Sequence, residues 1–139
     1  MKSDLVKLEQ DALKLMNSGK KAEAAELFSA IIKEQPSWEH GEAFYNLAVC
    51  YEDLGELHKA AENYLQALKY EPRNPYFLGG YASYLYLHGE PNAAFEAYLR
   101  LWRFEGNEQE SADKTLLVLR ELSKRLKISD QELEIRLKH

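Results

Sequence analysis

A glycine recurs along this chain at a nearly constant interval, and the same kinds of residue follow each copy. Gly19, Gly55 and Gly89 are separated by 36 and then 34 residues. An alanine comes five residues after each glycine and an aromatic residue nine after it: Ala24 and Phe28, Ala60 and Tyr64, Ala94 and Tyr98. Seventeen residues after each glycine stands a residue that ends helices, namely Pro36, Pro72 and Gly106. A period of this length predicts an array of repeated helical units.

The middle copy indicates what each unit is made of. Phe44, Leu47, Ala48 and Tyr51 stand at positions i, i+3, i+4 and i+7, which places them on one face of an amphipathic helix. Gly55 then ends this helix and a second helix follows. Each unit is therefore expected to be a pair of helices joined by a short turn.

These residues resemble the tetratricopeptide repeat, a helix-turn-helix unit of 34 residues. The second copy, residues 41–74, matches its pattern nearly throughout: Phe44, Leu47, Ala48, Tyr51, Gly55, Ala60, Tyr64, Ala67 and Pro72. The first copy, residues 5–38, departs at Asp11, where the family has Leu, and the third, residues 75–108, departs at Leu101 and Gly106. Glu39 and His40 form an insertion between the first two copies.

The resemblance implies an all-α fold, a right-handed α-solenoid of three such hairpins in a single domain spanning residues 1–139. Alanines are expected where paired backbones approach to about 8 to 10 Å. These positions are Ala12, Ala24, Ala48, Ala60, Ala82 and Ala94.

Residues 109–139 are expected to close the array with one or two helices. Apolar residues at helical spacing predict a capping helix over 111–127, which should cover Trp102 near Leu116 and Leu119. Ser129 and Glu132 form a capping-box pattern that predicts a further helix over 130–138, with Ile128 and Leu133 as its hydrophobic staple.

The resemblance further implies a concave groove, lined by the first helix of each repeat, in which a peptide or partner helix lies. The predicted groove residues are Leu13, Asn17, Glu42, Tyr45, Asn46, Val49, Glu52, Tyr76, Gly79, Ser83 and Tyr86. The same faces carry Val6, Glu9, Met16, Asp53 and Leu87.

Each feature of this groove has two interpretations. Tyr45, Tyr76 and Tyr86 either clamp apolar anchors of a ligand or pack on neighbouring helices. The acidic residues either favour a ligand with Lys or Arg or form a solvated face. Gly79 and Gly80 each cost about 1 kcal/mol relative to Ala inside a helix. Either a ligand approaches there, or the helix tolerates close packing or fraying.

Some members of the resembled family grip the acidic tail of heat-shock chaperones with a clamp of two Lys, two Asn and one Arg. The corresponding places here hold Glu9, Leu13, Asn46, Tyr76 and Gly80. Because only Asn46 fits, this type of clamp is not expected. The overall plan also looks like that of bacterial secretion chaperones, in architecture alone.

The composition argues against several other classes of protein. The net charge is −5, and the groove residues include no Lys or Arg, so no nucleic-acid partner is expected. No apolar run approaches the roughly 20 residues that span a bilayer, so we expect a cytoplasmic protein without a membrane partner. The four His residues are scattered, and Cys50 is expected to be a buried, inert thiol, so no metal, cofactor or catalytic site is expected.

We therefore predict a non-catalytic protein-protein interaction module, an adaptor, scaffold or chaperone-like protein, with a protein or peptide ligand of unknown identity. A self-assembling protein is the alternative, in which the groove docks the C-terminal helix of a neighbouring copy. Leu133, Ile135 and Leu137 would give that helix its apolar residues.

Overall fold

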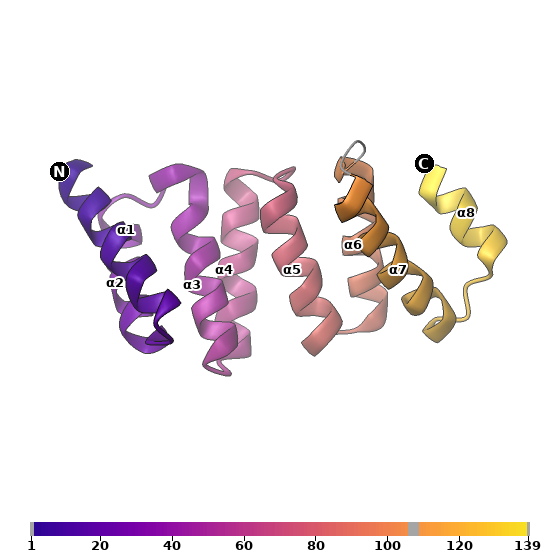
Figure 1. The fold of residues 1–139 in the computed structure, drawn as a ribbon, viewed down its shortest axis with the longest axis horizontal. Helices are drawn as coiled ribbons and strands as arrows, with labels where there is room; N and C mark the ends of the chain where they lie inside the picture. The colour runs from indigo at the N-terminus through magenta and orange to yellow at the C-terminus, as the bar shows by residue number, and fades with distance from the viewer. Residues whose placement is uncertain (1, 106–108, 139) are drawn as a thin grey trace. The chain divides into compact units, whose positions relative to one another are not determined.

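The computed structural model describes residues 2–105 and 109–138, and in these ranges the chain forms eight α-helices and one 3-10 turn. The chain divides into two compact units, Met1–Pro72 (unit 1) and Arg73–His139 (unit 2). The predicted all-α class is confirmed (Figure 1). Gly106 and the end of the third predicted repeat lie outside the described residues.

Unit 1 consists of two helix hairpins and the turn between them. α2 packs against α1 and α3, and α3 packs against α4 (Figure 1). The elements are α1 (Lys2–Asn17), α2 (Lys21–Glu34), the 3-10 turn η1 (Trp38–Gly41), α3 (Glu42–Asp53) and α4 (Leu57–Tyr70).

Unit 2 contains one further hairpin and two C-terminal helices. α6 packs against α5 and α7, and α8 contacts both α6 and α7. The elements are α5 (Pro75–His88), α6 (Pro91–Glu105), α7 (Gln109–Arg125) and α8 (Asp130–Lys138). The last helix has the predicted bounds, whereas α7 begins and ends two residues before the predicted 111–127.

The predicted alanines lie where the helices of each hairpin meet. Ala12, Ala24, Ala48 and Ala60 of unit 1 are completely buried, as are Ala82 and Ala94 of unit 2. A side chain of one carbon lets two helix backbones approach closely, and larger residues such as Phe28 and Phe95 fill the space beside them.

Glycine in the left-handed region ends the first helix of both hairpins in unit 1. Gly19 and Gly55 each have φ of +81°. The amide of Lys20 donates to the carbonyl of Leu15 at 2.9 Å, and that of Glu56 to Tyr51 at 2.9 Å. These bonds satisfy carbonyls that the last helical turn leaves without a partner, and glycine adopts the required φ without steric strain.

The predicted insertion forms the left-handed part of η1. Glu39 and His40 have φ of 47° and 55°, and Gly41 follows with φ of 94°. A Cβ on Gly41 would lie 2.9 Å from the Cβ of Tyr70, so this position has no room for a side chain.

The hairpin of unit 2 is built differently at both ends of its first helix. The side chain of Asn74 caps α5 by accepting hydrogen bonds from the amides of Tyr76 (2.9 Å) and Phe77 (3.1 Å). Gly89, at the other end, is extended, with φ of −108°.

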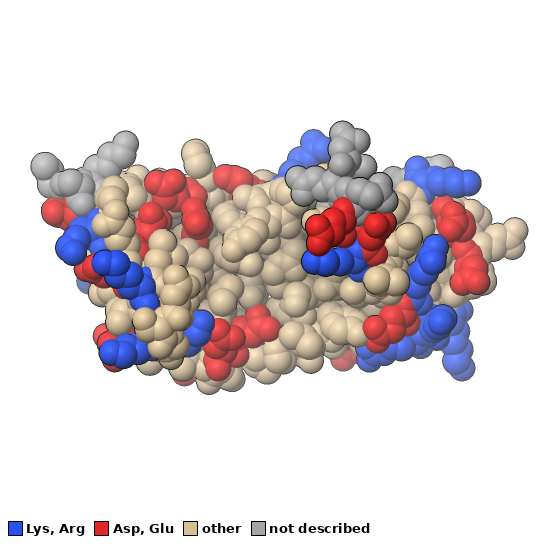
Figure 2. Space-filling model, viewed as in Figure 1, with Lys and Arg blue, Asp and Glu red and all other residues tan. Residues whose placement is uncertain are grey.

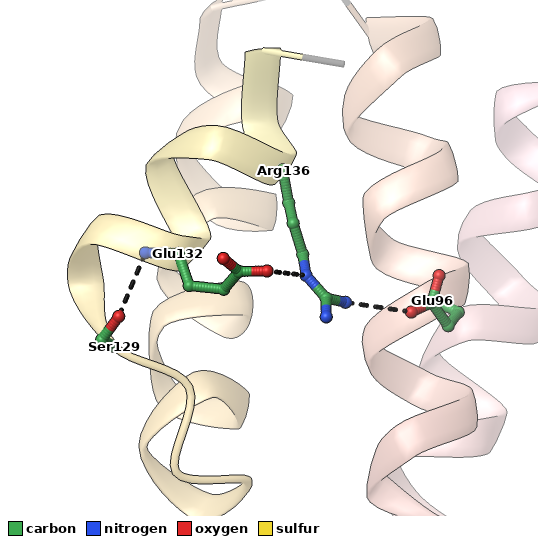
Figure 3. A network of polar contacts seen from close by, with 4 residues as sticks. All are labelled: Glu96, Ser129, Glu132 and Arg136. Atoms are coloured by element: carbon green, nitrogen blue, oxygen red, sulfur yellow. Dashed lines mark hydrogen bonds and ion pairs between the residues drawn. The ribbon is translucent and has the colours of Figure 1, made fainter.

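The C-terminal helix α8 is held on α6 by polar contacts and one buried side chain. The Ser129 hydroxyl accepts from the Glu132 amide at 3.1 Å, which is the predicted cap, but the Glu132 carboxylate accepts from Arg136 Nε at 3.1 Å (Figure 3). Arg136 also reaches Glu96 of α6 at 3.4 Å (Figure 3). Leu133 is 3% exposed.

Trp102 of α6 has a hydrogen-bond partner on the last helix. Its indole N–H donates to the carbonyl of Leu137 at 3.2 Å. This bond joins α6 to α8, and the predicted cover of Trp102 by α7, near Leu116 and Leu119, stays a prediction. A contact across 35 residues has no signature in the helical spacing.

Candidate functional site

The predicted groove residues divide between the two units. α1 carries Leu13 and Asn17, and α5 of unit 2 carries Tyr76, Gly79, Ser83 and Tyr86. The other five lie on α3 of unit 1, and they are Glu42, Tyr45, Asn46, Val49 and Glu52.

The α3 residues are mostly enclosed. Tyr45 is 8% exposed and Asn46 is 6% exposed. The ring of Tyr45 meets that of Tyr64 edge to face, with centroids 5.7 Å apart. In this conformation Tyr45 packs within its own unit and presents little surface to a ligand. Val49 and Leu13 are partly buried, and Asn17 is exposed.

Carboxylates gather around the start of α3. Partial burial raises the pKa of Glu42, and the nearby charges of Glu9, Glu39 and Glu71 raise it further. Figure 2 shows acidic side chains over η1 and the beginning of α3. The negative charge of Glu42 is therefore disfavoured by its surroundings.

The acidic residues at the other end of α3 have partners inside unit 1. The hydroxyl of Tyr64 donates to Glu52 at 2.7 Å, and burial together with this bond raises the pKa of Tyr64. Asp53 pairs with Lys21 at 3.1 Å. These bonds join the helices of unit 1 to one another, so Glu52 and Asp53 have a structural role whatever else they contact.

Glu9 also has a partner within the unit. The indole N–H of Trp38 donates to its carboxylate at 3.1 Å, and Trp38 itself is 3% exposed. Trp38 therefore packs in the core and orients a carboxylate of α1.

The α5 face of unit 2 has a different character. Tyr76 is 67% exposed and Leu87 is 63% exposed. Ser83, between them in sequence, is also exposed. The helix contains no Asp, Glu, Lys or Arg (Figure 2).

Tyr86 lies at the edge of this face and is tied to α7. Its hydroxyl donates to the carboxylate of Glu121 at 2.6 Å, and this bond raises the pKa of Tyr86. Its ring meets Tyr98 edge to face at 6.5 Å. Burial raises the pKa of Tyr98, whose hydroxyl is hydrogen-bonded to Ser83. These contacts fix the orientation of Tyr86.

The sequence analysis missed two residues of α7 that extend this face. Leu117 is 68% exposed, and Glu121 holds Tyr86. Stepping forward by one repeat of 34 residues from Ser83 and Leu87 reaches these two positions. The repeat register is a signal that identifies them, whereas the apolar spacing of this segment predicts only a capping helix.

Within the described residues, the thiol and the possible metal ligands do not come together in a reactive site. Cys50 is buried as predicted, and burial raises the pKa of its thiol to about 11, which keeps it protonated. Within 2–105 and 109–138 no three His, Cys, Asp or Glu residues are grouped so as to hold a metal ion. No helix in these ranges combines the length and apolar character needed to cross a bilayer.

The repeat matches a known family and a curated relative. The sequence profile of the family described as "Tetratricopeptide repeat" matches residues 41–74. Among curated proteins, the photosystem I assembly protein Ycf3 of Synechococcus sp. (strain CC9605) is 32% identical over 106 residues, which are 76% of this chain and 55% of that protein. The chain thus spans about half the length of this relative.

Solved structures resemble the chain over most of its length. The type III secretion translocator chaperone SycD of Yersinia enterocolitica gives a TM-score of 0.82 at 19% identity, covering 91% of this chain and 88% of that one. SycD in complex with a peptide of the translocator YopD gives 0.81 at 20% identity, covering 88% and 95%. The TPR2B domain of yeast Sti1, in a complex with pHsp70, gives 0.76 at 15% identity, covering 87% and 97%. At these identities the likeness shows a shared fold.

Proposed function

Because this chain is a tetratricopeptide-repeat protein, we propose that it is a non-catalytic protein-protein interaction module. It binds a peptide or a partner helix on the exposed faces of the first helices of its hairpins. Its role is that of an adaptor, a scaffold or a chaperone-like protein, and we place it in the cytoplasm.

The exposed apolar face of α5 is the observation that carries this proposal. Tyr76 and Leu87 are both more than 60% exposed, and they lie on a helix without a charged side chain. An apolar surface that a folded protein leaves open to water is characteristic of a site that a partner covers. The peptide complex of SycD and the pHsp70 complex of Sti1 support a protein or peptide ligand, because those proteins share this fold.

Affinity capture with matched variants tests the proposal. The intact chain and a Tyr76→Ser, Leu87→Ser double variant are immobilised and exposed to lysate of the source cells. Leu65→Ser is the control, because Leu65 is 46% exposed and lies on α4, a second helix. We expect proteins that bind the intact chain and the control but not the double variant. Equal capture by all three chains would contradict the proposal.

Self-assembly is the second candidate, and α8 is the element that favours it. This helix is short, Leu133 is its buried residue, and Ile135 is 51% exposed. Light scattering of the full chain and of a chain ending at Lys127 separates the two functions. An interaction module has the mass of one chain in both forms. A larger mass that only the full chain shows would favour assembly through α8.

A further inference from the structure

A cavity of about 410 Å³ lies between the last two helices of unit 2. α7 and α8 run in opposite directions on either side of it (Figure 1). It is lined by Arg120 and Lys124 of α7 and by Asp130, Leu133 and Glu134 of α8. The four charged residues are exposed, whereas Leu133 is buried and gives the cavity an apolar floor. The wall formed by α7 is therefore positive, and the wall formed by α8 is negative.

The charges of each wall form a pair. Arg120 and Lys124 stand four residues apart, as do Asp130 and Glu134, so the members of each pair are neighbours on the surface of their helix. None of the four side chains makes a hydrogen bond or an ion pair with another residue that the structure describes. Opposite charges thus line a common space without neutralising one another directly.

Neighbouring charges on the same helices are engaged elsewhere. Arg136 of α8 pairs with Glu132 at 3.1 Å and with Glu96 of α6 at 3.4 Å (Figure 3). On α7, Glu121 accepts a hydrogen bond from the hydroxyl of Tyr86 at 2.6 Å. The charges that line the cavity are therefore not neutralised by these neighbours.

The signs of the two walls select the kind of ligand. A simple anion would be attracted by α7 and repelled by α8, and a simple cation would experience the reverse. A neutral molecule would displace water from the charges without replacing its hydrogen bonds. A ligand with one negative and one positive group satisfies both walls. Because packed helices lie about 8 to 10 Å apart, these two groups must be close together in the ligand.

Ser123 provides a second observation on α7. It is 2% exposed, and its hydroxyl has no hydrogen-bond partner among the described residues. Ser123 stands three residues after Arg120 and directly before Lys124, so it adjoins the face of α7 that lines the cavity. Buried hydroxyls are nearly always hydrogen-bonded, to protein or to a bound molecule. The missing bond is available to a carboxylate that enters beside the two cations.

We propose that this cavity binds a free α-amino acid with an apolar side chain. Such a molecule joins its carboxylate and its ammonium group through a single carbon atom. The carboxylate lies between the two cations of α7, the ammonium group lies between the two carboxylates of α8, and the side chain contacts Leu133. The bound amino acid bridges α7 and α8 and holds the last helix in place. This site shares no residue with the exposed face of α5, so the inference does not depend on the proposed function.

Calorimetric titration of the full chain with L-leucine tests the inference. Two analogues that each lack one charge are the matched probes: L-leucinamide keeps the ammonium group, and N-acetyl-L-leucine keeps the carboxylate. We expect L-leucine to bind, and each analogue to bind more weakly by roughly tenfold, because each loses charge-assisted hydrogen bonds to one wall. Amide chemical shifts measured by NMR should change in α7 and α8.

Charge-removing variants connect each group of the ligand to its wall. Lys124→Gln should weaken the binding of L-leucine by roughly tenfold and leave that of L-leucinamide unchanged, since an ammonium group needs no cation. Glu134→Gln should weaken L-leucine in the same way and leave N-acetyl-L-leucine unchanged. Lys114→Gln is the control, because Lys114 lies on α7 outside the cavity and its side chain is 75% exposed. This variant should bind L-leucine as the natural chain does.

Ser123→Ala separates ligand binding from folding. It removes a buried hydroxyl that has no partner among the described residues, so the ligand-free chain should melt at a higher temperature. The same variant should bind L-leucine more weakly, because the carboxylate loses a donor. A gain in stability together with a loss of affinity cannot be attributed to misfolding.

The outcomes distinguish this inference from the proposed function. Equal binding of L-leucine and both analogues would overturn the inference, as would binding that survives both charge-removing variants. The absence of heat and of shift changes at millimolar L-leucine would overturn it as well. Shift changes confined to α5 would also overturn it, since the ligand would then lie on the face that carries the proposed function. None of these results changes the outcome of the affinity capture.

Discussion

The first helices of the two units present different chemistry. In unit 1, α1 and α3 carry carboxylates that are largely engaged within the unit: Glu9 with Trp38, Glu52 with Tyr64 and Asp53 with Lys21. In unit 2, α5 carries no charge and leaves Tyr76 and Leu87 exposed. The repeat pattern constrains the residues between paired helices and leaves the outward face of the first helix free to vary. One fold can therefore use this face for internal bonds in one hairpin and for an open apolar surface in another.

The largest expected effect concerns the internal bonds of unit 1. Tyr64 is 3% exposed and donates to Glu52, so Tyr64→Ala should lower the free energy of unfolding by about 3 to 5 kcal/mol. Urea denaturation followed by circular dichroism measures the loss. Tyr70→Ala is the matched control, because Tyr70 is 40% exposed. Equal losses in both variants would show that the Tyr64 side chain is not a central contact of unit 1.

The stability of unit 2 should depend in the same way on Leu133, the buried residue of α8. Leu133 is 3% exposed, and Leu133→Ala should cost about 2 to 4 kcal/mol. Proteolysis monitored by mass spectrometry should then show cleavage within 126–138 before any other segment. Ile135→Ala, at a residue 51% exposed, should leave the cleavage pattern unchanged. If Leu133→Ala resists proteolysis as well as the natural chain, α8 does not depend on this side chain.

Substitutions in the turns of the two units should change the stability by an intermediate amount. Lys127 has φ of 60° after α7, the region that Gly19 and Gly55 occupy after α1 and α3. Because only glycine adopts this region without strain, Lys127→Gly should stabilise the chain by about 1 kcal/mol. Gly55→Ala should destabilise it by about 1 kcal/mol, although nothing lies within 4 Å of the added Cβ. Melting temperatures of the two variants should shift in opposite directions.

The smallest expected effect is electrostatic and belongs to unit 1. The pKa of folded Glu42 is raised above its usual 4.5, so the folded chain binds this proton more tightly than the unfolded chain does. The resulting destabilisation is fully present above the raised pKa and disappears as the pH falls below 4.5. Glu42→Gln should therefore stabilise the chain at pH 7 by less than about 1 kcal/mol, since the cluster is partly exposed and screened. The gain should vanish near pH 4, as measured by urea denaturation at both pH values.

The helices, and the small residues buried where paired helices meet, could be predicted from the sequence because both follow from the local spacing of residues. Ala12, Ala48 and Ala82 recur at helical positions and are fully buried, and α8 has the bounds that Ser129 and Glu132 indicate. Contacts between distant side chains could not be predicted in this way. The enclosure of Tyr45 beside Tyr64 depends on the side-chain rotamers of both tyrosines, which lie on two different helices. Repeat spacing contains no information on rotamers.

The exposure of some candidate residues could be predicted from the sequence, but their contacts could not. The family resemblance implied that Tyr76, Gly79 and Ser83 line a concave groove; Tyr76 and Ser83 are exposed, and their place in a groove stays a prediction. Register alone could not show that Glu121 holds Tyr86, or that Ala would fit at Gly79. These properties come from α7 and α6, elements that lie far along the chain from α5.

The two tryptophans of the chain also fall one in each unit, Trp38 in unit 1 and Trp102 in unit 2, and each indole N–H donates to an oxygen of its own unit. Indole emission changes when such a ring passes into water. Replacing either tryptophan by Phe would leave a single indole, whose emission can be excited apart from that of the nine tyrosines, so the melting of each half could be recorded separately without an attached dye.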